Sequence, residues 1–179
     1  MKRLSGRIAI LITICYLSAS CQNTYVVSGS QEIIFQVEYF NNVEVYEHWG
    51  YFIDVNGNVF SYNLPEKWNF PGDDQTISKK EAMENLASSK LTEIKIPKSE
   101  LQKYINYIDN IAASKVTLSQ SKSTIEGTLS YYCYQYSENS SSYKRTIIKT
   151  KGHSKCENLN FYSKKVVAWM NEIGAYVPK

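Results

Sequence analysis

Apolar residues recur at every second position in the first strongly patterned segment of the chain. Ile33, Phe35, Val37 and Tyr39 lie two residues apart, a spacing that places their side chains on one face of a strand. The pattern predicts a half-buried strand at this point.

The pair Asn56-Gly57 is the clearest turn signal in the chain. Asparagine followed by glycine favours a two-residue type I′ hairpin, because both central residues adopt positive φ. Such a turn would pair Ile53 with Phe60 and Tyr51 with Tyr62, so the sequence predicts a ribbon with one largely apolar face.

Three later segments carry helix signals. Ser78 with Glu81 forms a capping box. Ser99 with Gln102 forms a second one, ahead of apolar residues that recur at about 3.6-residue spacing: Leu101, Tyr104, Ile105, Ile108, Ile111 and Ala112. A closing helix is expected to end at Gly174, since glycine is the preferred residue just after a helix.

Further strands are predicted at 92–96, 127–137 and 143–150. The order is strands, then helices, then two more strands and a closing helix, which is typical of the α+β class. We therefore expect a mainly antiparallel sheet with about three helices packed on one face, in a single domain over residues 31–179. A doubly wound parallel sheet is disfavoured, because helices do not regularly separate the strands.

The N-terminal segment has the layout of a bacterial export signal. Lys2, Arg3 and Arg7 precede an apolar run over residues 8–16, which is shorter than the ~20 residues that span a bilayer. A basic head, a short apolar segment and small residues before the cleavage site are what a secretory signal requires. The sequence predicts a lipoprotein-type signal peptide over residues 1–20.

Cys21 is the expected site of lipidation, with residues 21–30 as lipid anchor and tether. This assignment would attach the protein to a membrane of the bacterial envelope, facing the periplasm or the exterior. In the usual lipoprotein signal a leucine-like residue stands three places before the cysteine, whereas Leu17 stands four places before it. Ordinary cleavage is the alternative, since Ser18 and Ser20 are small residues at the required spacing.

Export would also change the net charge of the protein. The formal net charge is +3, but the signal segment contributes three basic residues and no acid, so the chain from Cys21 onward has a net charge of zero. No basic cluster comparable to a phosphate-binding groove remains, and nucleic acid is not an expected partner.

Three cysteines follow cleavage of the signal, an odd number for an oxidising compartment. If Cys21 carries lipid, Cys133 and Cys156 are left to form a disulfide. The bridge would close a loop of about 23 residues and contribute roughly 3 kcal/mol. Two buried free thiols are the alternative.

Catalytic and metal-binding motifs are missing from the sequence. His48 and His153 are the only histidines, and neither belongs to a zinc or hydrolase motif. Asp54, Asn56 and Asn58 resemble the opening of a calcium loop, but the glycine and glutamate that such a loop needs further on are absent. The sequence therefore predicts neither an enzyme nor a metal or cofactor site.

Tyrosine is unusually frequent, with fourteen of the fifteen tyrosines outside the signal peptide. Tyr131, Tyr132, Tyr134 and Tyr136 occupy both faces of one predicted strand. Exposed tyrosine suits recognition, because its ring offers a large rigid area with a polar tip. These four residues are a candidate binding surface, and the alternative is that they are core residues.

Two segments resemble a known group of proteins. They are Trp49-Gly50-Tyr51-Phe52-Ile53-Asp54 with Asn56-Gly57-Asn58-Val59-Phe60-Ser61-Tyr62, and the closing residues Gly152, Asn158, Ala168, Trp169 and Ile173. In these segments the chain resembles small, uncharacterised secreted lipoproteins of bacteria. The resemblance covers about a quarter of the exported chain. It implies export and a compact domain, and it supplies no activity or catalytic residue.

Two functional hypotheses follow, with an enzyme as a third, which His48 or His153 beside a carboxylate in a deep pocket would support. The first is a non-enzymatic protein-binding module, an inhibitor or immunity protein that docks a tyrosine-rich surface on its partner. The second is a glycan or cell-wall binding module that uses exposed tyrosine and tryptophan as stacking platforms. The solvent exposure of the tyrosines around Cys133 decides whether that strand can serve as a binding face.

Overall fold

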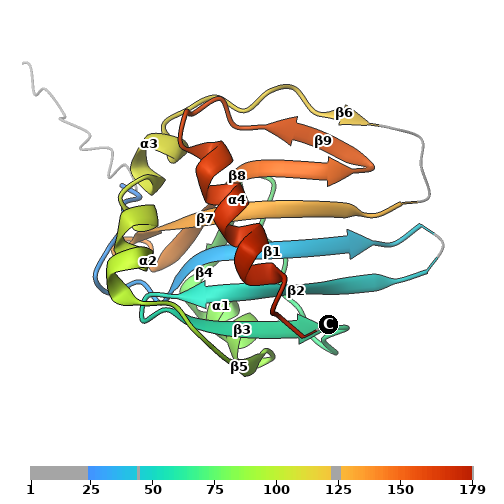
Figure 1. Ribbon diagram of the computed structural model, residues 1–179, viewed down its shortest axis with the longest axis horizontal. Coiled ribbons are helices and arrows are strands. Elements are labelled where there is room, and N and C mark those ends of the chain that lie inside the picture. Colours follow the sequence, from blue (N-terminus) through green and yellow to red (C-terminus); the bar gives the residue numbers. More distant parts are fainter. Residues whose placement is uncertain (1–23, 44, 122–125, 179) are drawn as a thin grey trace, which may run out of the picture.

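The computed structural model describes residues 24–43, 45–121 and 126–178; the predicted signal peptide and Cys21 lie outside these residues. The described chain forms one antiparallel sheet with helices against it (Figure 1). Its strands are β1 (Ile33–Asn41), β2 (Glu47–Asp54), β3 (Asn58–Asn63), β4 (Thr76–Ser78), β5 (Lys90–Lys95), β6 (Gln120–Ser121), β7 (Thr128–Ser137), β8 (Ser142–Gly152) and β9 (Ser154–Glu157). Its helices are α1 (Lys79–Ala87), α2 (Lys98–Ile105), α3 (Ile108–Ala112) and α4 (Ser163–Gly174).

The sheet has the strand order β5-β3-β2-β1-β7-β8-β9-β6, and β4 pairs with the first part of β8. The α+β class and the antiparallel sheet are thereby confirmed. In the described part of the chain, no helix has both the length and the apolar character that crossing a bilayer requires.

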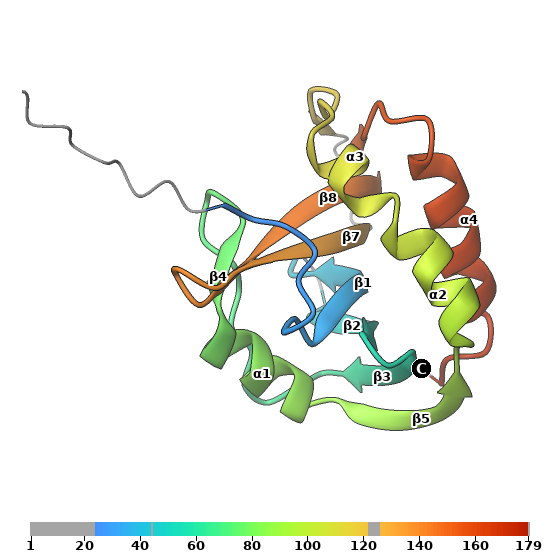
Figure 2. The same ribbon diagram turned by 90° about the vertical axis from the view of Figure 1, so that its left-hand side faces the viewer.

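The two faces of the sheet are covered by different helices, as the side view shows (Figure 2). One core cluster joins α2, α3 and α4 to the sheet through Leu101, Ile111 and Met170. A second cluster lies on the opposite face, where Ala82 of α1 packs with Phe52 and other aromatic residues. We call these the α4 face and the α1 face. The expectation that helices pack on one face only is not confirmed.

The β2–β3 hairpin turns at Asn56-Gly57, but with a longer loop than expected. Ile53 pairs with Val59, so three residues separate the strands instead of two. The Asp54 carbonyl accepts a hydrogen bond from the Gly57 N–H at 3.0 Å, and its carboxylate accepts bonds from the backbone N–H groups of Asn56 and Asn58. The predicted Ile53–Phe60 register is therefore wrong by one residue, which moves Phe60 to the opposite face of the ribbon.

Gly57 supplies a testable feature of this turn. Its φ is +81°, and a Cβ at this position would lie 2.4 Å from the Ile96 carbonyl oxygen. Gly57→Ala is expected to lower the free energy of unfolding by at least about 1 kcal/mol, because alanine combines an unfavourable φ with a backbone clash. Urea denaturation measures the loss. An Asn56→Ala variant, which keeps the glycine, should lose less, and equal losses would contradict the account.

Capping signals predicted one helix start correctly and one incorrectly. Ser78 and Glu81 form the reciprocal capping box at α1. The expected box at Ser99 is absent, because α2 begins directly after Pro97 without a side-chain cap. The predicted apolar stripe is divided between two helices, α2 and α3. Ile108 begins α3 and is fully buried in the core.

Gly174 is the last residue of α4 and does not form the expected stop after it. A Cβ at Gly174 would lie 3.3 Å from the ring of Tyr51. The absence of a side chain therefore allows the end of α4 to approach the sheet closely.

The segment expected to be a tether is partly bound to the domain. Val26 forms a β-bridge with Tyr136, and the Tyr25 hydroxyl is 3.0 Å from that of Ser142. Ser30 donates a 2.8 Å hydrogen bond to Glu138. Residues 25–30 thus belong to the folded domain, because backbone and hydroxyl groups of this polar segment find partners at the β7–β8 turn.

Candidate functional site

The four tyrosines of β7 are core residues, which makes the expected binding surface wrong. Tyr131, Tyr132, Tyr134 and Tyr136 are exposed by only 1%, 6%, 4% and 6%. Tyr131 belongs to the cluster on the α4 face, and the other three belong to the cluster on the α1 face. Helices and loops cover the sheet on both sides, so both faces of this strand are buried.

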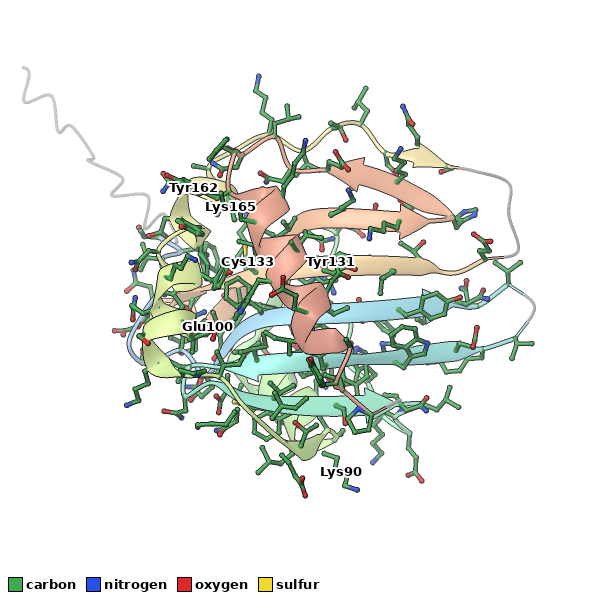
Figure 3. All side chains as sticks on the ribbon, viewed as in Figure 1. Lys90, Glu100, Tyr131, Cys133, Tyr162 and Lys165 are labelled. Atoms are coloured by element: carbon green, nitrogen blue, oxygen red, sulfur yellow. The ribbon has the colours of Figure 1, made fainter. Side chains whose placement is uncertain are left out.

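The hydroxyls of Tyr131 and Tyr134 form hydrogen bonds inside the protein. Tyr131 lies beneath α4 (Figure 3) and donates a 2.6 Å hydrogen bond to Asn171 Oδ1. The Tyr134 hydroxyl donates to Gln36 Oε1 at 2.5 Å. Burial raises the pKa of Tyr132 to about 12, although the nearby Arg145 opposes the shift. Burial also raises the pKa of Tyr131 and Tyr134, so Tyr131, Tyr132 and Tyr134 are neutral core groups.

Cys133 and Cys156 are free, buried thiols, so the expected disulfide is absent from the structure. Cys133 packs in the cluster on the α4 face. The Cys156 sulfur lies 3.3 Å from the Thr150 hydroxyl. Cys156 pairs with Thr150, and Thr150 pairs with Ser130. Ser130 lies two residues from Tyr132, so Cys156 lies on the α1 face. The two thiols therefore point to opposite sides of the sheet. Burial raises the pKa of Cys133 to about 12, which keeps this thiol protonated.

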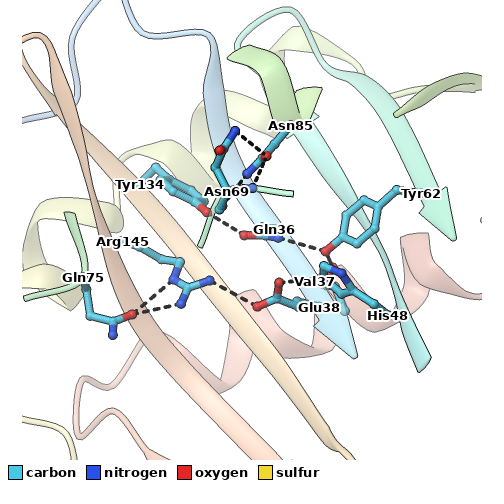
Figure 4. Close-up of polar contacts among 10 residues, drawn as sticks. All are labelled: Gln36, Val37, Glu38, His48, Tyr62, Asn69, Gln75, Asn85, Tyr134 and Arg145. Carbon is cyan, nitrogen blue, oxygen red and sulfur yellow. Dashed lines mark hydrogen bonds and ion pairs between the residues drawn. The ribbon is translucent and has the colours of Figure 1, made fainter. Parts of the chain in front are cut away.

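A charged cluster lies buried on the α1 face (Figure 4). Glu38 of β1 accepts a hydrogen bond from His48 Nε2 at 3.0 Å and forms an ion pair with Arg145 Nη1 at 3.1 Å. The Arg145 guanidinium also donates to Gln75 and stacks 3.9 Å above the ring of Tyr132. Three strands thus contribute to a compact ionic group inside the protein.

A neutral network adjoins this cluster. The Gln36 side chain donates to the Tyr62 hydroxyl at 2.8 Å, and the Tyr62 hydroxyl donates onward to the Val37 carbonyl at 3.3 Å. Burial raises the pKa of Tyr62 well above its usual value. These buried polar groups favour one strand register, because a shift of register would leave them without hydrogen-bond partners.

His48 is fully buried among aromatic rings. The rings of Phe40, Trp68 and Phe70 lie 4.8–5.6 Å from the imidazole, and Nδ1 has no hydrogen-bond partner among the described residues. Within the described ranges, no group of three or more histidine, cysteine or acidic side chains is placed to hold a metal ion. The contacts of the cluster join β1, β2 and β8 inside the protein.

The Glu38 carboxyl gives the cluster a predictable pH dependence. Burial raises its pKa, but hydrogen bonding from His48 and the charge of Arg145 outweigh burial and leave it below the usual value. A lowered folded-state pKa adds stability above the unfolded pKa of about 4.3, and this stability is lost as the pH falls through the folded value. The stability gap between wild type and Glu38→Gln should therefore be full above pH ~5 and shrink below it. Urea midpoints at several pH values measure the gap, and a constant gap would contradict the assignment.

The α4 face carries a row of side chains near the β1–β2 turn that the helix layer leaves partly exposed. Cross-strand pairing joins Trp49 to Asn63, Tyr39 to Trp49, Tyr39 to Leu129, and Leu129 to Lys151. We call these five residues the open row. Strands lie ~4.8 Å apart, so the row extends about 19 Å across the sheet.

An aromatic platform forms the centre of the open row. The rings of Tyr39 and Trp49 stack with centroids 4.9 Å apart and planes 18° from parallel. The Tyr39 hydroxyl accepts a 3.2 Å hydrogen bond from the Gly127 N–H. Both rings are intermediate in exposure, so they are held in place and remain accessible.

A cavity of about 250 Å³ lies between the open row and the end of α4. Its lining includes Trp49 and Leu129 from the row, Tyr51 and Tyr131 from the adjacent sheet positions, and Asn171 from the helix. The Tyr51 hydroxyl donates to a carbonyl of α4 and Tyr131 donates to Asn171, so the helix wall is fixed to the sheet floor. The row and the cavity form one continuous candidate binding site.

Sequence reasoning did not identify this site, although one signal for it was present. Tyr39 and Trp49 are aromatic residues on two neighbouring strands, and their pairing across β1 and β2 sets the platform. That register follows from the β1–β2 connection, which has no recognisable turn motif. Comparison of the chain with protein-family models, curated proteins and solved structures gives no match.

Proposed function

We propose that the chain is a non-enzymatic binding protein of the bacterial cell envelope, anchored by lipid on Cys21, and that it binds a glycan in the open row. The supporting observation is the accessible Tyr39–Trp49 platform beside the cavity under α4. The stacked rings cover one face of each other, so the pair presents its outer ring faces and ring edges as apolar area to a sugar ring. Neighbouring polar groups would satisfy the sugar hydroxyls.

The position of the open row suits an anchored protein. On β7, Tyr136 pairs with Val26 near the start of the described chain, whereas Leu129 of the open row lies seven residues away. Seven strand residues span about 23 Å. With lipid attached upstream of Val26, the row lies toward the end of the sheet that is remote from the anchor.

Binding to purified peptidoglycan and surface polysaccharide tests the proposal. The exported protein should sediment with one of these polymers, and Trp49→Ala should weaken the interaction about tenfold or more through loss of ring contact. Tyr132→Phe is the matched control, because Tyr132 is buried on the opposite face. Unchanged binding by Trp49→Ala would overturn the assignment of the site.

A protein partner is a second candidate, supported by a different surface. Large apolar side chains in the β1–β2 turn and in the β3–β4 connection are more than half exposed: Val43, Val45, Tyr46, Leu64 and Phe70. Exposed apolar groups of this kind are common in protein interfaces. A pull-down from envelope extract should recover a protein with wild type and lose it with Val45→Asp. Equal recovery by both would count against this surface.

A further inference from the structure

We infer that the open row is specific for an acidic saccharide, with Lys151 contacting a carboxylate of the sugar chain while a neighbouring sugar ring packs against the stacked Tyr39–Trp49 pair. The inference rests on the proposed function and adds the charge class of the ligand. It follows from the distribution of charge along one side of the row.

Lys151 forms the β8 end of the row. Its side chain is exposed, and its ammonium lies 5.5 Å from the centre of the Tyr131 ring. It has no ion pair with any residue in the described ranges. A cation held beside an aromatic floor and left without an acidic partner suits a ligand carboxylate.

More lysines lie next to this end of the row. Lys149 pairs with Glu157 across β8 and β9, and this register brings Lys151 beside Lys155. Lys149, Glu157 and Lys164 line one cavity, and Lys155 lies two residues before Glu157 on β9. The three lysines lower the pKa of Glu157. With one acidic residue among them, these lysines leave a net positive patch that complements an anionic ligand.

The opposite end of the row carries no lysine, and the exposed Glu47 lies two residues before Trp49 on the same face of β2. Asn63 of β3 is exposed and pairs with Trp49, so an amide replaces the cation there. The order along the row is amide, two stacked rings, an aliphatic side chain and an ammonium group. A saccharide whose rings carry hydroxyls and a carboxylate has groups that match this order. A polyanion without rings would contact only the lysine end of the row.

Two matched tetrasaccharides test the charge class. The acidic probe alternates glucuronic acid and N-acetylglucosamine, and the neutral probe consists of N-acetylglucosamine alone. Titration calorimetry with the exported protein at low salt should give about tenfold tighter binding of the acidic probe. Half-molar salt should reduce this preference, because exposed charges are screened within a few ångströms.

Three variants test which residues cause the preference for the acidic probe. Lys151→Gln should weaken binding of the acidic probe about threefold to fivefold and leave the neutral probe unchanged. Trp49→Ala should weaken both probes. Lys80→Gln removes the same charge from α1 and is the matched control, because the Lys80 side chain is 86% exposed and forms only a long ion pair with Glu84.

Each contrary result has a distinct meaning. Equal binding of both probes, lost in Trp49→Ala, would overturn the acidic specificity and leave the proposed glycan site intact. A polyglutamate peptide that binds as tightly as the acidic probe, and is insensitive to Trp49→Ala, would show simple charge attraction and overturn the inference. If neither probe bound, the inferred specificity would be overturned too. Sedimentation with the envelope polymers would then test the proposed glycan binding separately.

Discussion

Replacing Arg145 with methionine is expected to lower the free energy of unfolding by about 3–5 kcal/mol, because it leaves the buried Glu38 carboxylate without its cationic partner. The Glu38 and Arg145 side chains are 6% and 10% exposed, so water cannot replace the lost contact readily. Methionine keeps much of the aliphatic packing against Tyr132. Urea unfolding followed by tryptophan fluorescence measures the loss.

A double variant distinguishes charge from packing in this experiment. Glu38→Gln combined with Arg145→Met removes both charges, so it should recover part of the stability lost in the single variant. Additive losses in the double variant would show that the two residues are not energetically coupled. That result would contradict the buried ion pair shown in Figure 4.

Replacing Trp169 with alanine is expected to cost about 3–5 kcal/mol, the range for removing a large aromatic side chain from a core. Trp169 is 2% exposed and attaches α4 to its surroundings. Its ring meets Phe35 edge-to-face at 5.4 Å and stacks on Tyr104 at 4.0 Å. Its indole N–H donates to Glu100 at 2.6 Å.

Trp169→Phe is the control for this prediction. Phenylalanine keeps a ring between α4 and the sheet but loses the hydrogen bond to Glu100, so a loss of about 1–2 kcal/mol is expected. The fluorescence of the remaining tryptophans reports unfolding of both variants. Equal losses for alanine and phenylalanine would mean that the Glu100 bond, and not ring packing, holds the helix.

Local sequence signals predicted the fold class and several elements because those signals act over a few residues. The Ser78 capping box and the strands flanking Asn56-Gly57 are of this kind. The exact hairpin register was wrong because Asp54 binds the turn N–H groups and favours a three-residue loop. A shift of one residue was enough to exchange the faces of Phe60 and its neighbours.

Burial on both faces of β7 depends on distant parts of the chain, which local patterns do not reveal. Alternating tyrosines look like a surface strand until α1 covers one side and α4 covers the other. The separation of Cys133 from Cys156 has the same origin, since sequence spacing does not specify which face of a sheet a thiol occupies. The open row likewise depends on four strand pairings, which local sequence patterns do not specify.

The three tryptophans provide the most direct test of the binding site, because each lies in a different environment. Trp49 is in the open row, Trp68 packs on the α1 face, and Trp169 is in the core beneath α4. Two-dimensional NMR of the exported protein resolves their indole N–H signals while a soluble envelope polysaccharide is added. We predict that the Trp49 signal moves and that the Trp68 and Trp169 signals stay in place. Movement of the Trp68 signal with a fixed Trp49 signal would contradict the account.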